Sequence, residues 1–166
     1  MSAIQLSSLC STWLGDIETY LTSYGEYHNS ENVQVKLAMC ISLLEENIPY
    51  AISISKEILK DTLFNQRKEI LLSLKQIKSY MERDFISNGN DYAAKRVASY
   101  YSLEGACGES YLGISYYQFI CNILDNFDEE YENLINKLRD LLSYIFKSNT
   151  FRNINLRLFM ETNSCN

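Results

Sequence analysis

The sequence predicts an α+β fold in which an antiparallel sheet is covered on one face by several helices. Period-two alternation of apolar residues occurs near both ends of the chain, whereas between them the apolar residues recur every three or four positions. Two strands, then several helices, then a strand is the segregated order of α+β proteins. The length of 166 residues suits a single domain or a fragment of one.

The first third of the chain predicts a short helix followed by two strands. Residues 1–14 carry scattered apolar side chains, compatible with a helix that docks on a larger body. We expect the two strands to be antiparallel neighbours whose apolar side faces helices, with Gly25 ending or bulging the first. The residues on that side are Ile17, Thr19, Leu21, Val33, Val35, Leu37, Met39 and Ile41.

Two helices are expected in the middle of the chain. Ser42 and Glu45 have the spacing of a capping box and predict a helix with Pro49 in its first turns. A longer helix is expected over residues 65–86, ended by Gly89 in the left-handed conformation. The residues predicted to face inward from the two helices are Ile48, Ile52, Ile58, Leu59, Ile70, Leu71, Leu74, Ile77, Tyr80, Met81 and Phe85.

The last part of the chain predicts a short helix, a helical hairpin and a third strand. Asn90 or Asp91 caps the short helix, and Gly105 and Gly108 mark the loop before the hairpin. The hairpin begins at Ser115, a capping-box residue, and acidic residues 128–130 start its second helix. Alternation over residues 154–160 predicts the strand. The residues expected on the buried faces of the hairpin are Tyr116, Phe119, Ile120, Ile123, Leu124, Phe127, Tyr131, Leu134, Ile135, Leu138, Leu141, Leu142 and Ile145.

Composition excludes several classes of protein. The net charge of −6 disfavours nucleic acid, which needs a basic stripe. Five scattered cysteines without C-x-x-C spacing indicate free thiols in a reducing compartment. No apolar stretch reaches the roughly 18 residues needed to cross a bilayer. We therefore expect a soluble protein of the cytoplasm, in a bacterium, with no nucleic-acid or membrane partner.

No complete catalytic or metal-binding motif is present in the sequence. His28, the only histidine, stands in a polar link between the strands and is expected at the surface. The acidic cluster after Asp125 lacks the spacing of a calcium loop and is explained by helix-start charge. Neither phosphate-binding glycine motif occurs. We expect no catalytic residue, metal ligand or cofactor in this chain.

Aromatic residues near the hairpin are the candidate binding residues. Tyr111, Tyr116 and Tyr117, together with Tyr100, could line a groove for a peptide, because tyrosine offers a large contact area with a polar tip. Arg96 completes this set of possible peptide contacts. The same residues could instead pack inside the protein, and both interpretations stay open.

Several segments, in order from about Gly15 to Glu161, resemble one protein family. They include residues 69–102, EILLSLKQIKSYMERDFISNGNDYAAKRVASYYS; residues 113–146, GISYYQFICNILDNFDEEYENLINKLRDLLSYIF; and residues 153–161, NINLRLFME. The strongest points are Met81 and Glu82, the turn at residues 87–90, Arg96 with Ser99 and Tyr100, and residues 113–119. The chain resembles the third, non-catalytic, peptidase-associated region of pitrilysin/insulinase-type zinc metallopeptidases, in the presequence-protease branch.

The resemblance implies a long enzyme that encloses unstructured peptides and cuts them with zinc. In that family a His-x-x-Glu-His motif and a downstream Glu hold the metal, and here only His28 exists. The family's substrate-contacting Arg and Tyr pair also lies beyond the stretch resembled here. The implied role is a scaffold segment with zinc elsewhere in the parent enzyme. Its implied partners are the remaining regions of the same peptidase and the peptide substrate.

Two other functions stay open. One is a free-standing α+β protein-interaction module with a tyrosine-rich helical surface. The other is a small cysteine-dependent enzyme, which would need a cysteine of low pKa. If the sheet is cut from a larger one, its open edge should pair with a second copy and give an edge-strand dimer.

Overall fold

The structure, a computed structural model, describes residues 3–26, 29–60 and 62–145. In chain order these ranges hold α1 (Ala3–Trp13), β1 (Asp16–Glu26), β2 (Asn29–Ser42), the 3₁₀ helix η1 (Glu45–Asn47), α2 (Ile48–Lys60), α3 (Arg67–Ser87), α4 (Gly89–Ala98), α5 (Leu103–Leu112), α6 (Ile114–Asp125) and α7 (Phe127–Ile145). The predicted α+β class with a helical hairpin, here α6 and α7, is confirmed. None of the helices in these ranges is long and apolar enough to cross a membrane.

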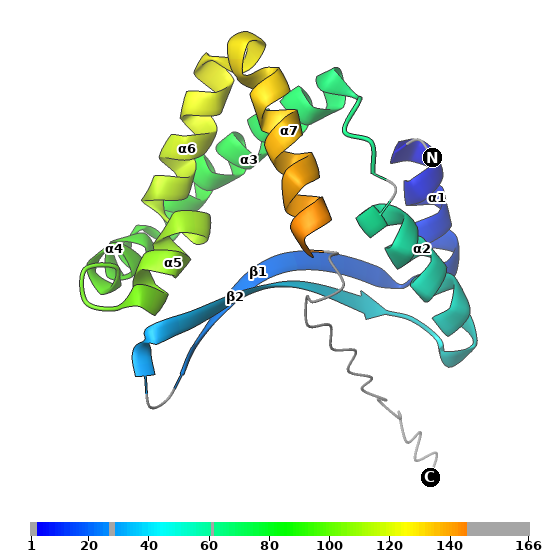
Figure 1. Cartoon of the computed structure of the whole chain (residues 1–166), viewed down its shortest axis with the longest axis horizontal. Coiled ribbons are helices and arrows are strands. Elements are labelled where there is room, and N and C mark those ends of the chain that lie inside the picture. Colours follow the sequence, from blue (N-terminus) through cyan, green and yellow to red (C-terminus); the bar gives the residue numbers. More distant parts are fainter. Residues whose placement is uncertain (1–2, 27–28, 61, 146–166) are drawn as a thin grey trace.

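The two strands form a long antiparallel ribbon, as predicted. Ile17 pairs with Ile41 and Leu21 with Leu37, so the apolar residues of both strands share one face. The register shifts between Gly25 and Glu26, where the first strand was expected to end or bulge. The helices gather on one side of the ribbon, with α3 to α7 arching over it and α1 and α2 packed at one of its ends (Figure 1).

Two separate hydrophobic cores hold the described chain together. The first consists of Leu14, Ala51 and Ile54, where α1 and α2 meet the end of the ribbon. The second lies in the helical arch, where residues of α6 and α7 pack against α3; its buried members are Ile123, Phe127, Tyr131 and Ile135. Contacts of α5 with β1 and β2 join the arch to the ribbon.

The connection between α2 and α3 holds an unusual backbone conformation. Phe64 has a φ of +48°, the left-handed region that side chains with a Cβ rarely adopt. Its ring packs on the second core, and its carbonyl oxygen accepts a hydrogen bond of 3.4 Å from the Tyr131 hydroxyl. These contacts of α7 compensate for the strain.

Helix α5 was not predicted. Gly105 and Gly108 were interpreted as loop residues, but both lie within this helix. Ser102 caps it by accepting a hydrogen bond from the Gly105 N–H at 2.9 Å. A Cβ on Gly105 would lie 2.4 Å from the Ala98 carbonyl oxygen, so glycine lets α5 approach the end of α4. The glycine therefore reports close packing, not a loop.

Three predicted helix caps are wrong. Ser42 stays in β2, and the helix after it starts at η1 with Leu44 as its N-cap. Ser115 is the second residue of α6, whose N-cap is Gly113. Gly89 does not end α3 in the left-handed conformation; it begins α4, and the cap residue Asn88 bonds the Asp84 carboxylate of α3 instead. In each case tertiary contacts override the local pattern.

Four residues predicted to face inward are exposed, and other predictions lie outside the described residues. The exposed side chains are Ile52, Tyr80, Phe119 and Leu141, which lie at the margins of their apolar stripes. The centres of those stripes, such as Ile54 and Ile135, are buried. The third strand at residues 154–160 and the side chains of His28 and Leu59 are not described.

Candidate functional site

Arg96 connects three consecutive helices. Its Nη1 in α4 donates to Oε1 of Glu109 in α5 at 3.0 Å and to Oγ of Ser115 in α6 at 2.9 Å. The backbone N–H and the hydroxyl of Ser115 donate to the same carboxylate oxygen, at 3.0 and 3.2 Å. The hydrogen bond with Glu109 raises the pKa of Arg96. These bonds explain why α6 starts without a side-chain cap of its own.

Glu109 is the buried centre of this network. Only 3% of the residue is exposed, and its Oε2 has no hydrogen-bond partner among the described residues. Gly113 closes over it, because a Cβ there would lie 1.8 Å from Oε2. The φ of Gly113, −107°, suits any residue, so glycine is needed here for space alone. The paired charges brace α4, α5 and α6 against one another.

An open apolar pocket of about 380 Å³ lies beside this network, between α3, α4 and α6. Its lining residues are Phe85, Gly89, Tyr92, Ala93, Ile114, Tyr117 and Gln118. The Phe85 ring meets Tyr92 and Tyr117 edge-on, with centroid distances of 4.4 and 5.1 Å. Such a pocket suits an apolar side chain.

The tyrosine hydroxyls at this pocket are held by carboxylates of α3. Tyr92 donates to Asp84 at 2.6 Å, and Tyr117 donates to Glu82 at 2.9 Å. Burial, and then the bond to Asp84, raise the pKa of Tyr92 to about 12. The bonds from Tyr92 and Asn88 lower the pKa of Asp84. Both tyrosines are therefore neutral near pH 7 and act as donors, not as bases.

The pKa values of Tyr116 and Tyr117 are also raised. For Tyr117 the cause is its hydrogen bonding, first with Cys121 and then with Glu82. For Tyr116, which is half-buried, the cause is burial. Neither hydroxyl is suited to accept a proton from a substrate at neutral pH.

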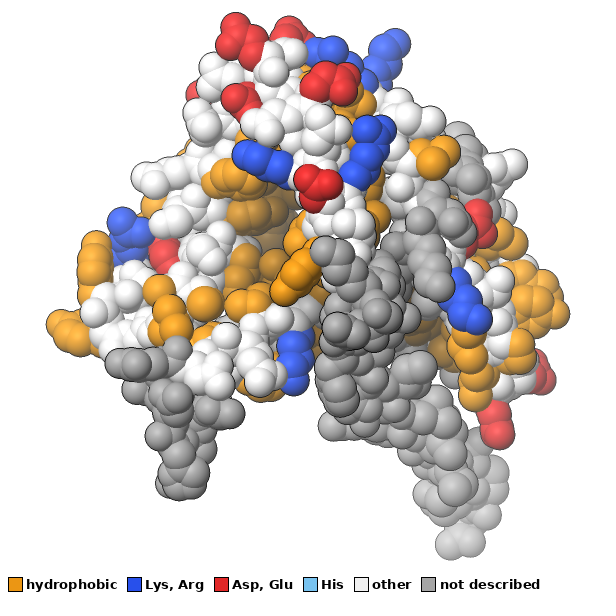
Figure 2. All heavy atoms as spheres, in the orientation of Figure 1, with side chains coloured by type: hydrophobic (Ala, Val, Ile, Leu, Met, Phe, Trp, Pro, Cys, Tyr) orange, Lys and Arg blue, Asp and Glu red, His pale blue; other side chains and the backbone are white. Residues whose placement is uncertain are grey.

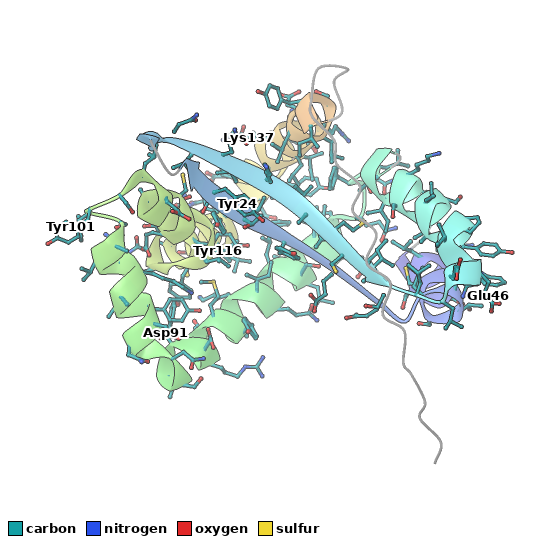
Figure 3. The ribbon with its side chains drawn as sticks, turned by 90° about the horizontal axis from the view of Figure 1, so that it is seen from below. Tyr24, Glu46, Asp91, Tyr101, Tyr116 and Lys137 are labelled. Atoms are coloured by element: carbon teal, nitrogen blue, oxygen red, sulfur yellow. The ribbon has the colours of Figure 1, made fainter. Side chains whose placement is uncertain are left out.

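The predicted binding residues do not line a single groove. Tyr111 bonds Ser23 of the ribbon at 3.1 Å, and Tyr117 lines the pocket. Tyr100 lies beyond the end of α4, is 72% exposed and has the Arg96 guanidinium 5.7 Å from its ring centre. Figure 3 shows Tyr116 among the helices and Tyr101 at the outer end of the molecule, pointing away from it. Whether any of them contacts a peptide stays a prediction.

Sequence patterns missed the residues that organise this region. Glu109 was placed in a loop, and Asp84 and Tyr92 were given no polar role. A single carboxylate among small and apolar residues, as in LEGACGESYL, is the signal that could have identified Glu109, because such a residue needs a partner when its helix packs.

The described residues offer no metal site and no thiol chemistry that the structure supports. Among them, no group of three or more His, Cys, Asp or Glu side chains could hold a metal ion. Cys40 is exposed, and Cys10, Cys107 and Cys121 are half-buried. The arrangement can pack, brace and present surface, and it places no general base beside a nucleophile within the described ranges.

Comparison with known proteins agrees with this picture. The family model described as peptidase M16, subfamily C, associated matches residues 1–123. The chain is similar to "Protein HypA" of Clostridium perfringens (strain 13 / Type A), with 23% identity over 158 residues that cover 90% of this chain and 16% of that protein. The chain thus spans a minor part of the relative's length. Because the family model covers most of it, the chain belongs to this peptidase-associated family, a non-catalytic region of pitrilysin-type peptidases.

Proposed function

We propose that this chain is a scaffold segment of a zinc-dependent metallopeptidase that encloses and degrades unstructured peptides. We also propose that the parent belongs to the presequence-protease branch and works in a bacterial cytoplasm. The family match over residues 1–123 supports the proposal most strongly. The relative is much longer than the matched stretch, as expected if this region is one part of a larger enzyme.

Zinc does not fit the residues of this chain. The sequence has one histidine, so a His-x-x-Glu-His motif is absent from it. The most buried carboxylate, Glu109, is paired with Arg96 and enclosed by Gly113. No catalytic step is therefore assigned to these residues. In the proposed enzyme the metal is held by other regions, and this segment supplies rigid helices around the peptide.

The proposal is tested by the gene and by activity. We expect an open reading frame that continues beyond this sequence and encodes His-x-x-Glu-His upstream. The purified longer polypeptide should hydrolyse an unstructured peptide, and a chelator or a His→Ala change in the motif should abolish hydrolysis. The isolated chain should bind no stoichiometric zinc and cut nothing. Hydrolysis by the isolated chain, or a frame without the motif, would reject the proposal.

A free-standing interaction module is the second candidate, favoured by the turn between α4 and α5. This turn presents Tyr100 and Tyr101, which are 72% and 85% exposed, and Ser99 and Ser102 hold it through hydrogen bonds to Arg96 O and Gly105 N. Figure 2 shows hydrophobic side chains at this end of the molecule. The candidate predicts that the isolated chain binds a partner, and that Tyr101→Ala removes binding without loss of helix content.

A further inference from the structure

The apolar face of the ribbon is covered at both ends and open in the middle. At one end Ile17 packs with the core of α1 and α2. At the other end Ser23 bonds Tyr111 of α5. Between these ends Leu21, Val35 and Leu37 remain 43%, 49% and 39% exposed. We call these three residues the open stretch.

The distribution of charge indicates that this whole face is built to be buried. Asp16, Glu18 and Lys36 belong to the alternate set of positions and point to the opposite face. That opposite face also carries Tyr24, which Lys36 overlies at 5.1 Å from the ring centre, and it is turned away from the helices (Figure 3). A strand pair with all charge on one face is typical of a sheet whose other face lies in a core.

The dimensions of the opening fit one further helix. Ile17 and Ser23 lie about 20 Å apart along β1, at roughly 3.3 Å per residue. Part of this length is taken up by α2 at one end and α5 at the other. A helix with its side chains is about 10 Å across, so one helix fills the remainder. Because α3 to α7 arch above the ribbon, the occupant must be slender enough to enter beneath them (Figures 1 and 2).

We propose that the open stretch is the docking surface for an apolar helix from another region of the same longer polypeptide. The inference rests on the proposed function, which makes this chain one part of a larger enzyme. The relative offers the required length, since 16% of it matches this chain and the remainder lies outside the match. A second copy of this chain is disfavoured, because the helical arch prevents two such faces from meeting flat against each other (Figure 1).

The test measures thiol accessibility in the full longer polypeptide. All native cysteines are replaced by alanine, and Val35→Cys places one thiol on the open stretch. The matched control keeps only Cys40, which is exposed and lies on the opposite face of the same strand. We expect Val35→Cys to react with a small maleimide more than about tenfold slower than Cys40, and the two thiols to react equally once unfolded in urea. Leu37→Cys provides a second probe if Val35→Cys does not fold.

Each other result would overturn the inference. Equal labelling of Val35→Cys and Cys40 in the folded polypeptide means that nothing covers this face. Protection that disappears on dilution means that a second copy covers it. Protection that persists in the isolated chain at every concentration means that the chain covers the face itself. Labelling needs neither zinc nor peptide, so a protected Val35→Cys in an inactive polypeptide would reject the proposed enzyme and leave the docking surface standing.

Discussion

The contact between Gly113 and Glu109 provides a substitution whose effect can be worked out from distances. In Gly113→Ala the new Cβ would lie 1.8 Å from Oε2, 2.4 Å from Cδ and 2.8 Å from the backbone oxygen of Glu109. The backbone angles of Gly113 suit alanine, so no conformational strain is added. The effect is therefore steric, and the Glu109 side chain must move.

The cost follows from what Glu109 would lose. Its Oε1 accepts the N–H and the hydroxyl of Ser115 as well as the Arg96 guanidinium. Displacing the carboxylate breaks bonds to a charged group and leaves polar groups unpaired in a buried site, which costs about 3 kcal/mol. Replacing glycine also reduces the freedom of the unfolded chain, which offsets this by about 0.5–1 kcal/mol. We expect a net loss of about 2 kcal/mol.

Urea unfolding followed by far-ultraviolet circular dichroism, which reports helix content, measures this loss. Gly108→Ala is the matched control, because nothing lies within 4 Å of a Cβ at that position in the same helix. It should stabilise the chain by about 0.5–1 kcal/mol. A second control places Gly113→Ala in a Glu109→Ala background, where the side-chain clash is gone.

In that background the penalty of Gly113→Ala should fall below about 1 kcal/mol, with only the backbone oxygen contact remaining. Two results would refute the reasoning. One is a Gly113→Ala variant as stable as the original chain. The other is an equal penalty with and without the Glu109 side chain, since the clash would then not be the cause.

Three further predictions concern the second core and the pocket. Ile135→Ala should cost about 3–4 kcal/mol in urea unfolding, because Ile135 is 2% exposed, whereas Leu141→Ala should stay within about 0.5 kcal/mol. Arg67→Ala should cost about 1 kcal/mol, because its guanidinium stacks on two aromatic rings of α7, and an unchanged midpoint would contradict this. The Tyr92–Asp84 bond should make stability depend on pH at both extremes. Since the folded pKa of Asp84 is lowered, its contribution is present above the ordinary value of 3.8 and is lost as pH falls through the folded value. Since the pKa of Tyr92 is raised from 10.0 to about 12, its contribution is present below pH 10 and is lost as pH rises towards 12. Unfolding across pH should show Tyr92→Phe weakening both dependences, and superimposable profiles would contradict the assignment.

The ribbon and the long helices could be predicted from the sequence because their patterns extend over many residues. Alternation in β1 and β2 identifies both strands, their antiparallel pairing and the shared apolar face. The stripe through Ile123, Phe127 and Ile135 likewise identifies the buried side of the hairpin. Each pattern reports burial directly, so one misplaced residue does not change the result.

The helix ends and the site could not be predicted, because partners distant in sequence decide them. Ser115 fits the capping-box pattern with Gln118, yet its hydroxyl and N–H bond Glu109 of the preceding helix. The glycines of α5 suggested a loop, whereas Gly105 serves a contact with α4 that only the folded chain creates. The predicted tyrosines share a segment, but helical rotation directs them to different neighbours, Tyr111 to the ribbon and Tyr117 to α3.

The balance of buried and exposed side chains bears on whether this chain is a complete folding unit. Ten hydrophobic residues are buried in the described ranges, whereas 21 large hydrophobic residues there are exposed. Isolated exposed apolar residues are ordinary, but Leu21, Val35 and Leu37 form a continuous surface on a face without charge. The two cores share no residue, so covering the open stretch would also connect the ribbon to the arch between them. A region that completes its burial against neighbouring regions explains both features, and membership of a peptidase-associated family supplies such neighbours.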